Sequence, residues 1–177
     1  MMSSPERADP PLTLVLVGPM AAGKTSVGRK VARLLEVPFS DTDKRIAAVH
    51  GPIPQIFAEH GEPYFRELER AAVAATVADG GVVSLGGGAV TDAATRALLT
   101  RHPVVFLTVS PEAVSRRIGG TGRPLLTGDD DPLERWRRIF DERRGWYEEV
   151  ADLTVDTSRT PMRMLAERIA AWRKEQE

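Results

Sequence analysis

The sequence predicts an α/β fold built on a parallel sheet. Short apolar runs rich in β-branched residues, such as TLVLV and VVFLTV, alternate along the chain with longer segments of helical periodicity. Two of the apolar runs lead directly into glycine-containing loops, at residues 18–23 and 86–88. Runs so short and so continuously apolar are typical of strands buried on both faces, and their alternation with helices indicates a parallel sheet.

The predicted elements follow one another in a regular order. The five predicted strands are residues 13–17, 37–40, 82–85, 104–109 and 153–155. Apolar spacing and capping residues predict helices over residues 24–36, 43–50, 55–79 (interrupted near Gly61 and Pro63), 92–100, from 111 onward, 133–150 and 161–174. Pro38, the prolines at 52 and 54 and the glycines at 80 and 81 separate these elements. We find no repeat and no sign of a second domain.

Length and composition narrow the class of protein. The 177 residues suit one domain over residues 11–177 after a flexible tail of residues 1–10, which lacks the apolar core of a secretory signal. The net charge of -1 gives no general attraction for nucleic acid or membrane lipid. The absence of cysteine excludes disulfides and thiolate metal sites, and no apolar run approaches the roughly 20 residues of a membrane span. We therefore expect a cytoplasmic protein without nucleic-acid or membrane partners.

Residues 18–25 match the phosphate-binding pattern G-x-x-x-x-G-K-[ST]. A strand precedes the loop and a helix follows it, so backbone N–H groups and the helix dipole can surround a phosphate chain. Lys24 would reach the terminal phosphates and Thr25 would bind Mg²⁺. The alternative is a plain strand–turn–helix joint, but such a joint has no use for Lys24 and Thr25. The motif predicts nucleotide binding by a GTPase, a motor or a kinase.

The acidic partner of this loop must come from elsewhere, because the N-K-x-D guanine motif and a standard second Walker strand are both absent. Asp41 and Asp43 follow the second predicted strand. In an extended segment these two side chains share a direction, so one could face Mg²⁺ and the other an acceptor hydroxyl. The alternative role is a helix N-cap.

Two further segments carry residues suited to an anionic acceptor. Arg66 could grip a carboxylate with both arms of its guanidinium, and Glu69, one helical turn later, could hold it in position. The alternative is an exposed ion pair on a helix surface, which is the better interpretation of these two residues taken alone. Residues 86–88 are three glycines directly after a buried strand, and this favours close approach of the backbone to a ligand over a simple flexible turn.

Two arginine-containing segments follow. Arg123 lies between glycines in a segment without apolar periodicity, about residues 119–131, which predicts a mobile lid that brings a cation to the transferred phosphate. The alternative is a surface loop with an incidental arginine. Arg143 and Arg144 are expected to close the helix that precedes residue 150, where positive charge also simply favours the helix dipole.

Taken together and in this order, these motifs resemble the shikimate kinases, from about Leu12 to the last helix. The resemblance implies a P-loop fold of the nucleoside-monophosphate-kinase type, with a five-stranded parallel sheet flanked by helices and a mobile lid. It implies transfer of the ATP γ-phosphoryl group to the 3-hydroxyl of shikimate, in aromatic amino acid biosynthesis. Two rivals remain, namely a kinase of the same fold for another acceptor such as gluconate, and a nucleotide-binding module without chemistry.

The resemblance also implies roles for individual residues. The expected ATP-binding residues are Ala21, Ala22, Gly23, Lys24, Thr25, Ser26, Arg117, Arg123 and Arg159. The expected shikimate-binding residues are Asp43, Arg66, Gly87, Gly88 and Arg143. Mg²⁺ is expected at Thr25, Asp41 and Ser84, and the catalytic residues are expected to be Lys24, Asp43 and Arg123. The partners are ATP and shikimate, and a monomer is expected. Ala21 departs from the family, since most relatives have glycine there, and we expect at most an altered nucleotide affinity.

Overall fold

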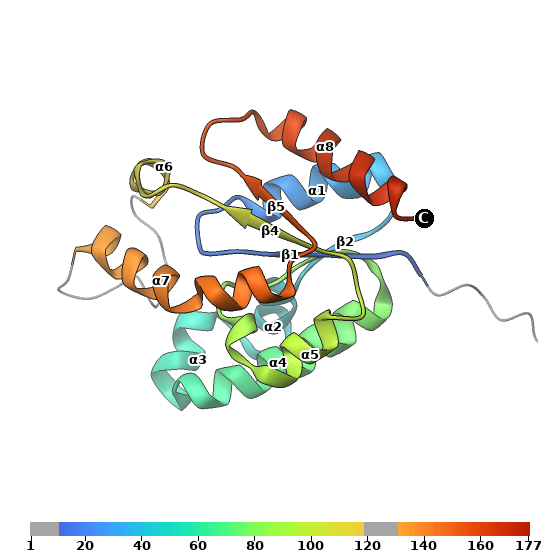
Figure 1. Cartoon of the computed structure of the whole chain (residues 1–177). Coiled ribbons are helices and arrows are strands. Elements are labelled where there is room, and N and C mark those ends of the chain that lie inside the picture. The colour runs from blue at the N-terminus through green and yellow to red at the C-terminus, as the bar shows by residue number, and fades with distance from the viewer. Residues whose placement is uncertain (1–10, 119–130) are drawn as a thin grey trace, which may run out of the picture.

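The computed structural model describes residues 11–118 and 131–177. The predicted tail, nearly all of the predicted lid and Arg123 lie outside these ranges. The described chain contains a five-stranded sheet in the order β2-β3-β1-β4-β5, in which all pairings are parallel (Figure 1). The strands are β1 Thr13–Val17, β2 Phe39–Asp41, β3 Gly81–Ser84, β4 Val104–Thr108 and β5 Leu153–Asp156. The predicted α/β fold with five parallel strands is confirmed.

Helices cover both faces of this sheet (Figure 1). Their bounds are α1 Lys24–Leu35, α2 Thr42–His50, α3 Ile53–His60, α4 Glu62–Asp79, α5 Ala93–Leu99, α6 Pro111–Arg117, α7 Pro132–Val150 and α8 Met162–Glu175, with a 3₁₀ turn η1 at Ala89–Thr91. Within the described residues, no helix is long and apolar enough to cross a membrane.

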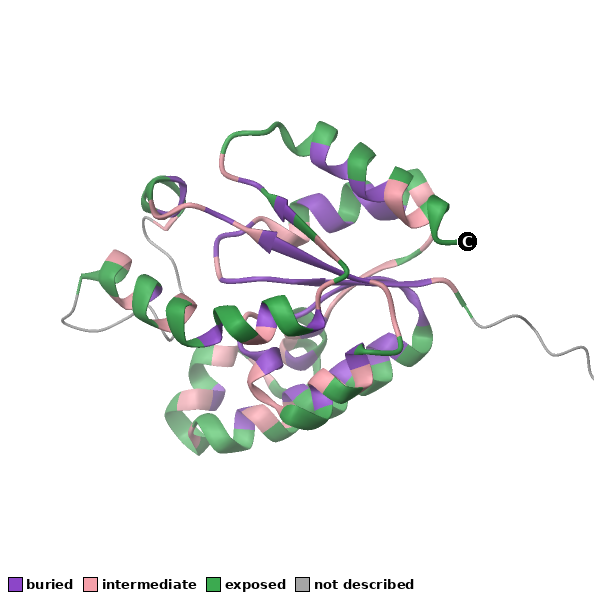
Figure 2. Cartoon of the chain, in the orientation of Figure 1, coloured by how far each residue is buried: buried purple, intermediate pink, exposed green. Residues whose placement is uncertain are grey.

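The alternation of side chains along β1 divides the core into two layers. Leu14 and Leu16 pack with apolar residues of α1 and α8, whereas Val15 and Val17 pack with those of α4 and α7. All five residues of β1 are buried, as Figure 2 shows for the central strands. Burial on both faces explains why this strand is a continuous apolar run rather than an alternating one.

Two predicted boundaries, the start of the second strand and the start of the helix predicted from residue 55, differ from the structure by two residues. The second strand begins at Phe39 rather than at residue 37, because the preceding residues still form the C-terminal cap of α1. Glu36 has a left-handed conformation (φ 56°), and the N–H of Val37 donates to Ala32 O. The interruption predicted near Gly61 is present, because α3 ends at His60 and α4 begins at Glu62. The first of these helices, α3, starts at Ile53 rather than at residue 55. Pro54 is tolerated there because N–H groups in the first turn have no intrahelical partner, so its missing N–H costs no hydrogen bond.

The carboxyl ends of the parallel strands meet along one edge of the sheet. The loop after β1, the β2–α2 junction at Asp41 and the glycines after β3 all lie along this edge, because β1 pairs with β3 and β3 pairs with β2. Ligands of open α/β sheets bind at this edge. The topology therefore brings together the motifs that the sequence places far apart.

Candidate active site

The loop between β1 and α1 is built for close backbone approach. Gly18 has φ 151°, and a Cβ there would lie 2.3 Å from the carbonyl oxygen of Leu107, so only glycine fits. Gly23 precedes α1 with φ 85°, and no side chain caps that helix. The first-turn N–H groups of α1 therefore remain available to an anion, which the helix dipole also favours. A cavity of about 240 Å³ lies against this loop and is lined by residues 20–26.

Side chains from three distant elements hold consecutive carbonyl groups of this loop. The indole Nε1 of Trp136 donates to Met20 O at 2.9 Å, Arg117 Nη1 donates to Ala21 O at 2.9 Å, and Thr157 Oγ1 donates to Ala22 O at 2.8 Å. In a trans peptide the N–H points away from the C=O, so fixing these carbonyls also fixes the neighbouring N–H groups. The loop is thus preorganised as an anion site.

Lys24 and Thr25 make different contacts within this site. The ammonium of Lys24 donates to Gly18 O at 2.7 Å and to Pro19 O at 2.9 Å. The hydroxyl of Thr25 donates to Asp41 Oδ2 at 2.9 Å. Ser84 is paired in register with Asp41 across β2 and β3 and lines the same cavity. The three residues predicted for Mg²⁺ therefore lie together beside the phosphate loop.

Asp41 caps a helix and also contacts the phosphate loop. Its Oδ1 accepts the N–H of Lys44 at 3.2 Å and so caps α2, while its Oδ2 faces Thr25. Asp43 lies in the first turn of α2 rather than in an extended segment, so the alternation predicted for this pair is wrong. Both carboxylates nevertheless line the same two cavities, because α2 begins directly at the sheet edge.

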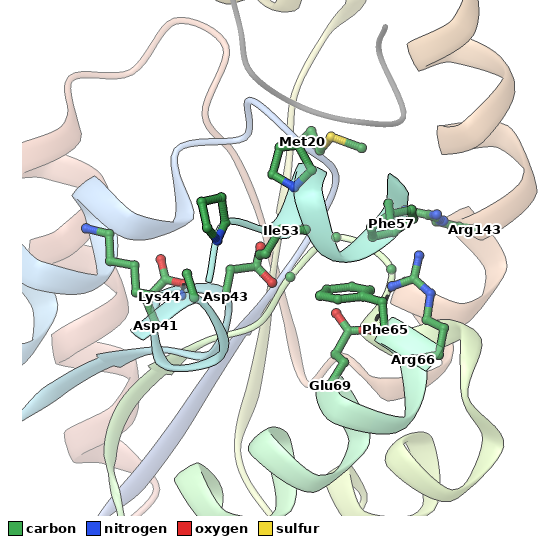
Figure 3. Close-up of a pocket in the computed structure, with 16 residues that line it drawn as sticks. Met20, Asp41, Asp43, Lys44, Ile53, Phe57, Phe65, Arg66, Glu69 and Arg143 are labelled. Atoms are coloured by element: carbon green, nitrogen blue, oxygen red, sulfur yellow. Dashed lines mark hydrogen bonds and ion pairs between the residues drawn. The ribbon is translucent and has the colours of Figure 1, made fainter. Parts of the chain in front are cut away.

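A second cavity, of about 430 Å³, adjoins the first and carries a charged wall and an apolar wall (Figure 3). Its residues come from the β2–α2 junction, α3, α4, the glycine loop and α7. The charged wall is formed by Asp43, Arg66, Glu69 and Arg143, and the apolar wall includes Ile53, Phe57 and Phe65. Such a cavity suits a small ring with several polar substituents and a negative charge.

Arg66 and Glu69 form a buried pair rather than the surface ion pair that was the alternative. Arg66 Nη1 lies 2.6 Å from Glu69 Oε2, and Glu69 is only 3% exposed. Burial raises the pKa of Glu69 to about 7, although the charge of Arg66 opposes this rise. Arg66 also contacts Glu62 at 3.0 Å, which fixes the guanidinium from its solvent side.

Asp43 carries an unpaired oxygen in the cavity. Within the described part of the chain, its buried Oδ1 has no hydrogen-bond partner. Burial raises the pKa of Asp43, the charge of Asp41 adds to this rise, and Lys24 and Arg66 oppose it. An unsatisfied buried carboxylate oxygen of raised basicity is suited to accept a proton or a hydroxyl hydrogen bond from a ligand.

The glycines after β3 lie within contact distance of these charged groups. A Cβ on Gly86 would lie 2.6 Å from Asp43 Oδ1 and 2.7 Å from Glu69 Oε1, and one on Gly88 would lie 2.3 Å from Arg66 Nη1. Glycine at these two positions therefore lets the loop lie directly against these side chains, while the predicted approach to a ligand stays a prediction. The neighbours of the loop are the polar side chains of the second cavity.

The two cavities share part of their lining. Met20, Asp41, Asp43, Gly86 and Gly87 line both of them. A phosphate chain in the first cavity would therefore end where a ligand in the second cavity begins. This arrangement can support transfer of a terminal phosphoryl group between the two ligands.

The comparisons with known proteins agree with this geometry. The family model described as shikimate kinase matches residues 20–174. The chain belongs to the shikimate kinase family. It is 50% identical to the shikimate kinase of Salinispora arenicola over 158 residues. The matched region covers 86% of this chain and 93% of the relative.

Solved structures give the same result for the fold. A shikimate kinase from Acinetobacter baumannii in complex with shikimate has a TM-score of 0.88 and 36% identity, covering 94% of this chain and 95% of the other. A gluconokinase from Sinorhizobium meliloti has a TM-score of 0.60 and 21% identity, covering 94% of each chain, and shows the fold alone. The predicted family, P-loop kinase fold and enzyme class are confirmed.

The other predicted residues differ in their placement. Arg143 is 6% exposed and lines the second cavity from the middle of α7, so the prediction that it closes a helix is wrong. Arg117 donates to the carbonyls of Ala21 and Thr157 and connects the phosphate loop to the loop after β5. Arg159 is exposed in that loop, and Ser26 lines the first cavity.

The sequence does not predict that Trp136, Thr157 and Tyr147 hold the two loops from outside. The family resemblance includes Tyr147 in an Arg-x-x-x-Tyr motif with Arg143, and it places Thr157 in a stretch, residues 156–159, expected near adenine. Neither implies these contacts, and no motif marks Trp136. A buried tryptophan or tyrosine needs a partner for its polar atom, which is the one signal that could have pointed to such a contact.

Proposed function

We propose that this protein transfers the γ-phosphoryl group of ATP to the 3-hydroxyl of shikimate, giving shikimate 3-phosphate and ADP. The observation that carries the proposal is the junction of the two cavities at Asp41 and Asp43. One cavity has the backbone geometry of a phosphate site, and the other has paired arginines and an apolar wall. Membership of the shikimate kinase family supports the same acceptor.

The second cavity matches the chemistry of shikimate group by group. The carboxylate is held by Arg66 and Arg143, which both line the cavity. The ring lies against the apolar wall at Ile53 and Phe57, and its hydroxyls meet Asp43 and the backbone at Gly87 and Gly88. A gluconate chain would leave the flat apolar wall without a ring to contact.

Asp43 orients the acceptor and takes its proton. The 3-hydroxyl oxygen forms a bond to the γ-phosphorus while the bond from that phosphorus to the β–γ bridging oxygen breaks, and the hydroxyl proton passes to Asp43. The raised pKa of this carboxyl brings its basicity closer to what proton transfer requires. Lys24 exchanges its contacts with Gly18 O and Pro19 O for the phosphate oxygens.

The residues beside the phosphate loop fit Mg²⁺. Thr25 and Asp41 offer a hydroxyl and a carboxylate 2.9 Å apart, with Ser84 adjacent. Among the described residues there is no group of three or more His, Cys, Asp or Glu side chains that could hold a metal alone, as expected for an ion bound mainly by phosphate and water. When bound, the ion neutralises phosphate charge. Thr25, Asp41 and Ser84 would hold it directly or through water.

Three parts of the proposal extend beyond the described site. Arg123, in the predicted lid over about residues 119–131, brings a positive charge to the transferred phosphoryl group. Arg117 and Arg159 border the adenine, on the side where Arg117 joins the phosphate loop to residue 157. The protein acts as a monomer in the cytoplasm.

Product analysis tests this function. ADP release is followed with shikimate, gluconate and several nucleoside monophosphates as acceptors, and the phosphorylated product is assigned by NMR. We expect turnover with shikimate and a phosphate on its 3-oxygen. Turnover only with another acceptor would identify a different kinase of the same fold, and ATP binding without any turnover would indicate a nucleotide-binding module.

A further inference from the structure

Tyr147 lies one helical turn beyond Arg143 on α7 and lines neither of the two cavities. It is 1% exposed, and its ring packs on Phe106 and Phe140 with centroid distances of 5.2 Å and 6.3 Å. Its hydroxyl donates a hydrogen bond to the carbonyl of Gly87. Burial raises the pKa of this hydroxyl to about 12, so Tyr147 remains protonated and able to donate near neutral pH.

The carbonyl of Gly87 and the N–H of Gly88 belong to one peptide unit. The described chain has no cis peptide bond, and in a trans peptide these two groups point in opposite directions. A hydrogen bond that holds the Gly87 oxygen toward Tyr147 therefore turns the Gly88 N–H away from Tyr147. Within the described residues, neither the N–H of Gly87 nor that of Gly88 donates to another protein group.

A peptide between two glycines needs such an anchor. Glycine enters left-handed and right-handed conformations with similar ease, so the unit between Gly87 and Gly88 can flip at low cost. The neighbouring carbonyls accept only from the turn that follows: Gly86 O from the N–H of Ala89 at 3.1 Å, and Gly88 O from the N–H of Thr91 at 3.1 Å and from its hydroxyl at 2.7 Å. Of the described contacts, the Tyr147 hydroxyl is the one that fixes the Gly87 oxygen from another element.

The flipped orientation would place an oxygen where the acceptor requires a donor. Arg66 lies directly against Gly88, and Asp43 lies directly against Gly86, because a Cβ at either glycine would clash with them. A carbonyl turned into the cavity would add negative charge next to the Asp43 carboxylate. Such a change would weaken the binding of acceptor hydroxyls without altering the phosphate loop.

We propose that Tyr147 is a positioning residue, which holds the peptide between Gly87 and Gly88 with its N–H toward the acceptor. The proposal rests on the proposed function for the identity of the acceptor, but the peptide orientation itself does not depend on it. Tyr147 lines neither cavity and acts on the acceptor through Gly87, although its hydroxyl also interacts with the Arg143 side chain.

The test compares Tyr147→Phe with a matched control. Tyr64 is the other tyrosine of the chain, and it is 40% exposed and stacks on His60 at 4.3 Å, so Tyr64→Phe removes the same hydroxyl from the surface. Dissociation constants for shikimate and ADP are measured by calorimetry on the full chain. We expect Tyr147→Phe to raise the dissociation constant for shikimate about five- to tenfold, the usual effect of losing one hydrogen bond. The dissociation constant for ADP should be unchanged. The control should match the wild type for both ligands.

A second measurement reports on the peptide without any acceptor. In NMR spectra of the isotope-labelled protein, Gly87 and Gly88 should each give one sharp amide signal in the wild type and in Tyr64→Phe. In Tyr147→Phe we expect doubled or broadened signals at these two glycines, as the peptide exchanges between orientations.

The outcomes separate this inference from the proposed function. Unchanged Gly88 signals in a folded Tyr147→Phe variant would overturn the inference. So would a variant in which the melting temperature falls and the affinities for shikimate and ADP fall together, because that would indicate a general loss of stability. If the wild type does not bind shikimate at all, the proposed function fails, and the amide signals alone then decide the role of Tyr147.

Discussion

Thr25 and Asp41 are joined by a hydrogen bond of 2.9 Å between Thr25 Oγ1 and Asp41 Oδ2, across 16 residues of sequence. The other oxygen of the same carboxylate caps α2 through the N–H of Lys44. One side chain therefore connects the phosphate loop to the helix that presents Asp43. Two substitutions can separate its roles.

Asp41→Asn should keep the cap and lose the charge, because asparagine caps helices about as well as aspartate. We expect little change in the free energy of unfolding, but a higher Mg²⁺ concentration for half-maximal activity. Asp41→Ala should in addition lose about 1 kcal/mol of stability with the cap. Urea unfolding and Mg²⁺ titrations of activity measure the two effects. Equal destabilisation by both substitutions would contradict the capping role.

Asp43→Asn should lower kcat by a factor of about 10² to 10⁴, the range for loss of a general base, while ADP affinity remains near that of the wild type. The reason is that an amide preserves shape but cannot accept the proton. Single-turnover kinetics and calorimetry with ADP check the two parts. A large loss of ADP affinity would mean that Asp43 supports the nucleotide rather than the acceptor.

Arg66→Lys should raise the KM for shikimate at least tenfold, which corresponds to a loss of about 1.4 kcal/mol or more of interaction free energy. Lysine cannot reproduce the two-armed contact with a carboxylate, and the KM for ATP should change little. Arg45 offers a matched control, because it pairs with Asp79 at 2.8 Å on the surface. Arg45→Lys should leave both constants unchanged. A rise in the KM for ATP alone after Arg66→Lys would contradict the assignment.

The sequence was sufficient where structure depends on local chemistry. The strand at 13–17 and the loop that follows it could be predicted because burial pattern, glycines, lysine and threonine lie within one short segment. Of the acceptor wall, Asp43 and the glycines at 86–88 could be predicted from local chemistry, whereas Arg66 and Arg143 could be assigned only through the family resemblance. Arg66 alone, for example, gave a surface ion pair as the better interpretation, and only its burial with Glu69 decides otherwise.

The contacts that the sequence could not supply are long-range ones. Trp136 and Met20 are 116 residues apart, and Thr157 and Ala22 are 135 apart. Any buried donor at those places could satisfy the loop carbonyls, so the type of residue does not predict which carbonyl it contacts. The start of β2 was missed for a related reason, because the left-handed turn at Glu36 carries neither glycine nor asparagine.

Glu69 should make stability depend on pH in the opposite sense to an ordinary paired carboxylate. Its pKa is raised to about 7 in the folded protein from an ordinary value of 4.5, so the folded state binds more protons between these values. Stability from this group is therefore fully present below about pH 4.5 and is lost as the pH rises to about 7. Asp43, also raised, acts in the same direction.

Glu69→Gln removes this titration and should flatten the profile, while Glu175→Gln, at an exposed position in the last turn of α8, should leave it as in the wild type. Urea unfolding between pH 5 and pH 8 gives the comparison, and the expected difference is on the order of 1–3 kcal/mol. Parallel profiles for the wild type and Glu69→Gln would show that Glu69 is ionised throughout. Because glutamine also weakens the pairing with Arg66, only the pH dependence, and not the absolute stability, bears on this point.

Ala21 occupies a left-handed conformation, with φ 66°, within the phosphate loop. A Cβ in this conformation costs roughly 1–2 kcal/mol, and glycine recovers that amount less the entropy of a more flexible unfolded chain. Ala21→Gly should therefore leave stability unchanged or raise it by up to about 1 kcal/mol. The carbonyl of Ala21 is held by Arg117 in either case, so the loop should keep its shape and ADP affinity should change only slightly.

Ala22 provides the matched control, because it is fully buried beside Ala21 and is not among the described residues with positive φ. Ala22→Gly should destabilise by about 1 kcal/mol, since glycine adds unfolded-state entropy and removes a buried methyl without relieving strain. Thermal unfolding should therefore show a loss of stability for Ala22→Gly and no loss for Ala21→Gly at the adjacent position. If both glycines destabilise equally, the backbone at Ala21 carries no strain, and alanine is there for packing alone.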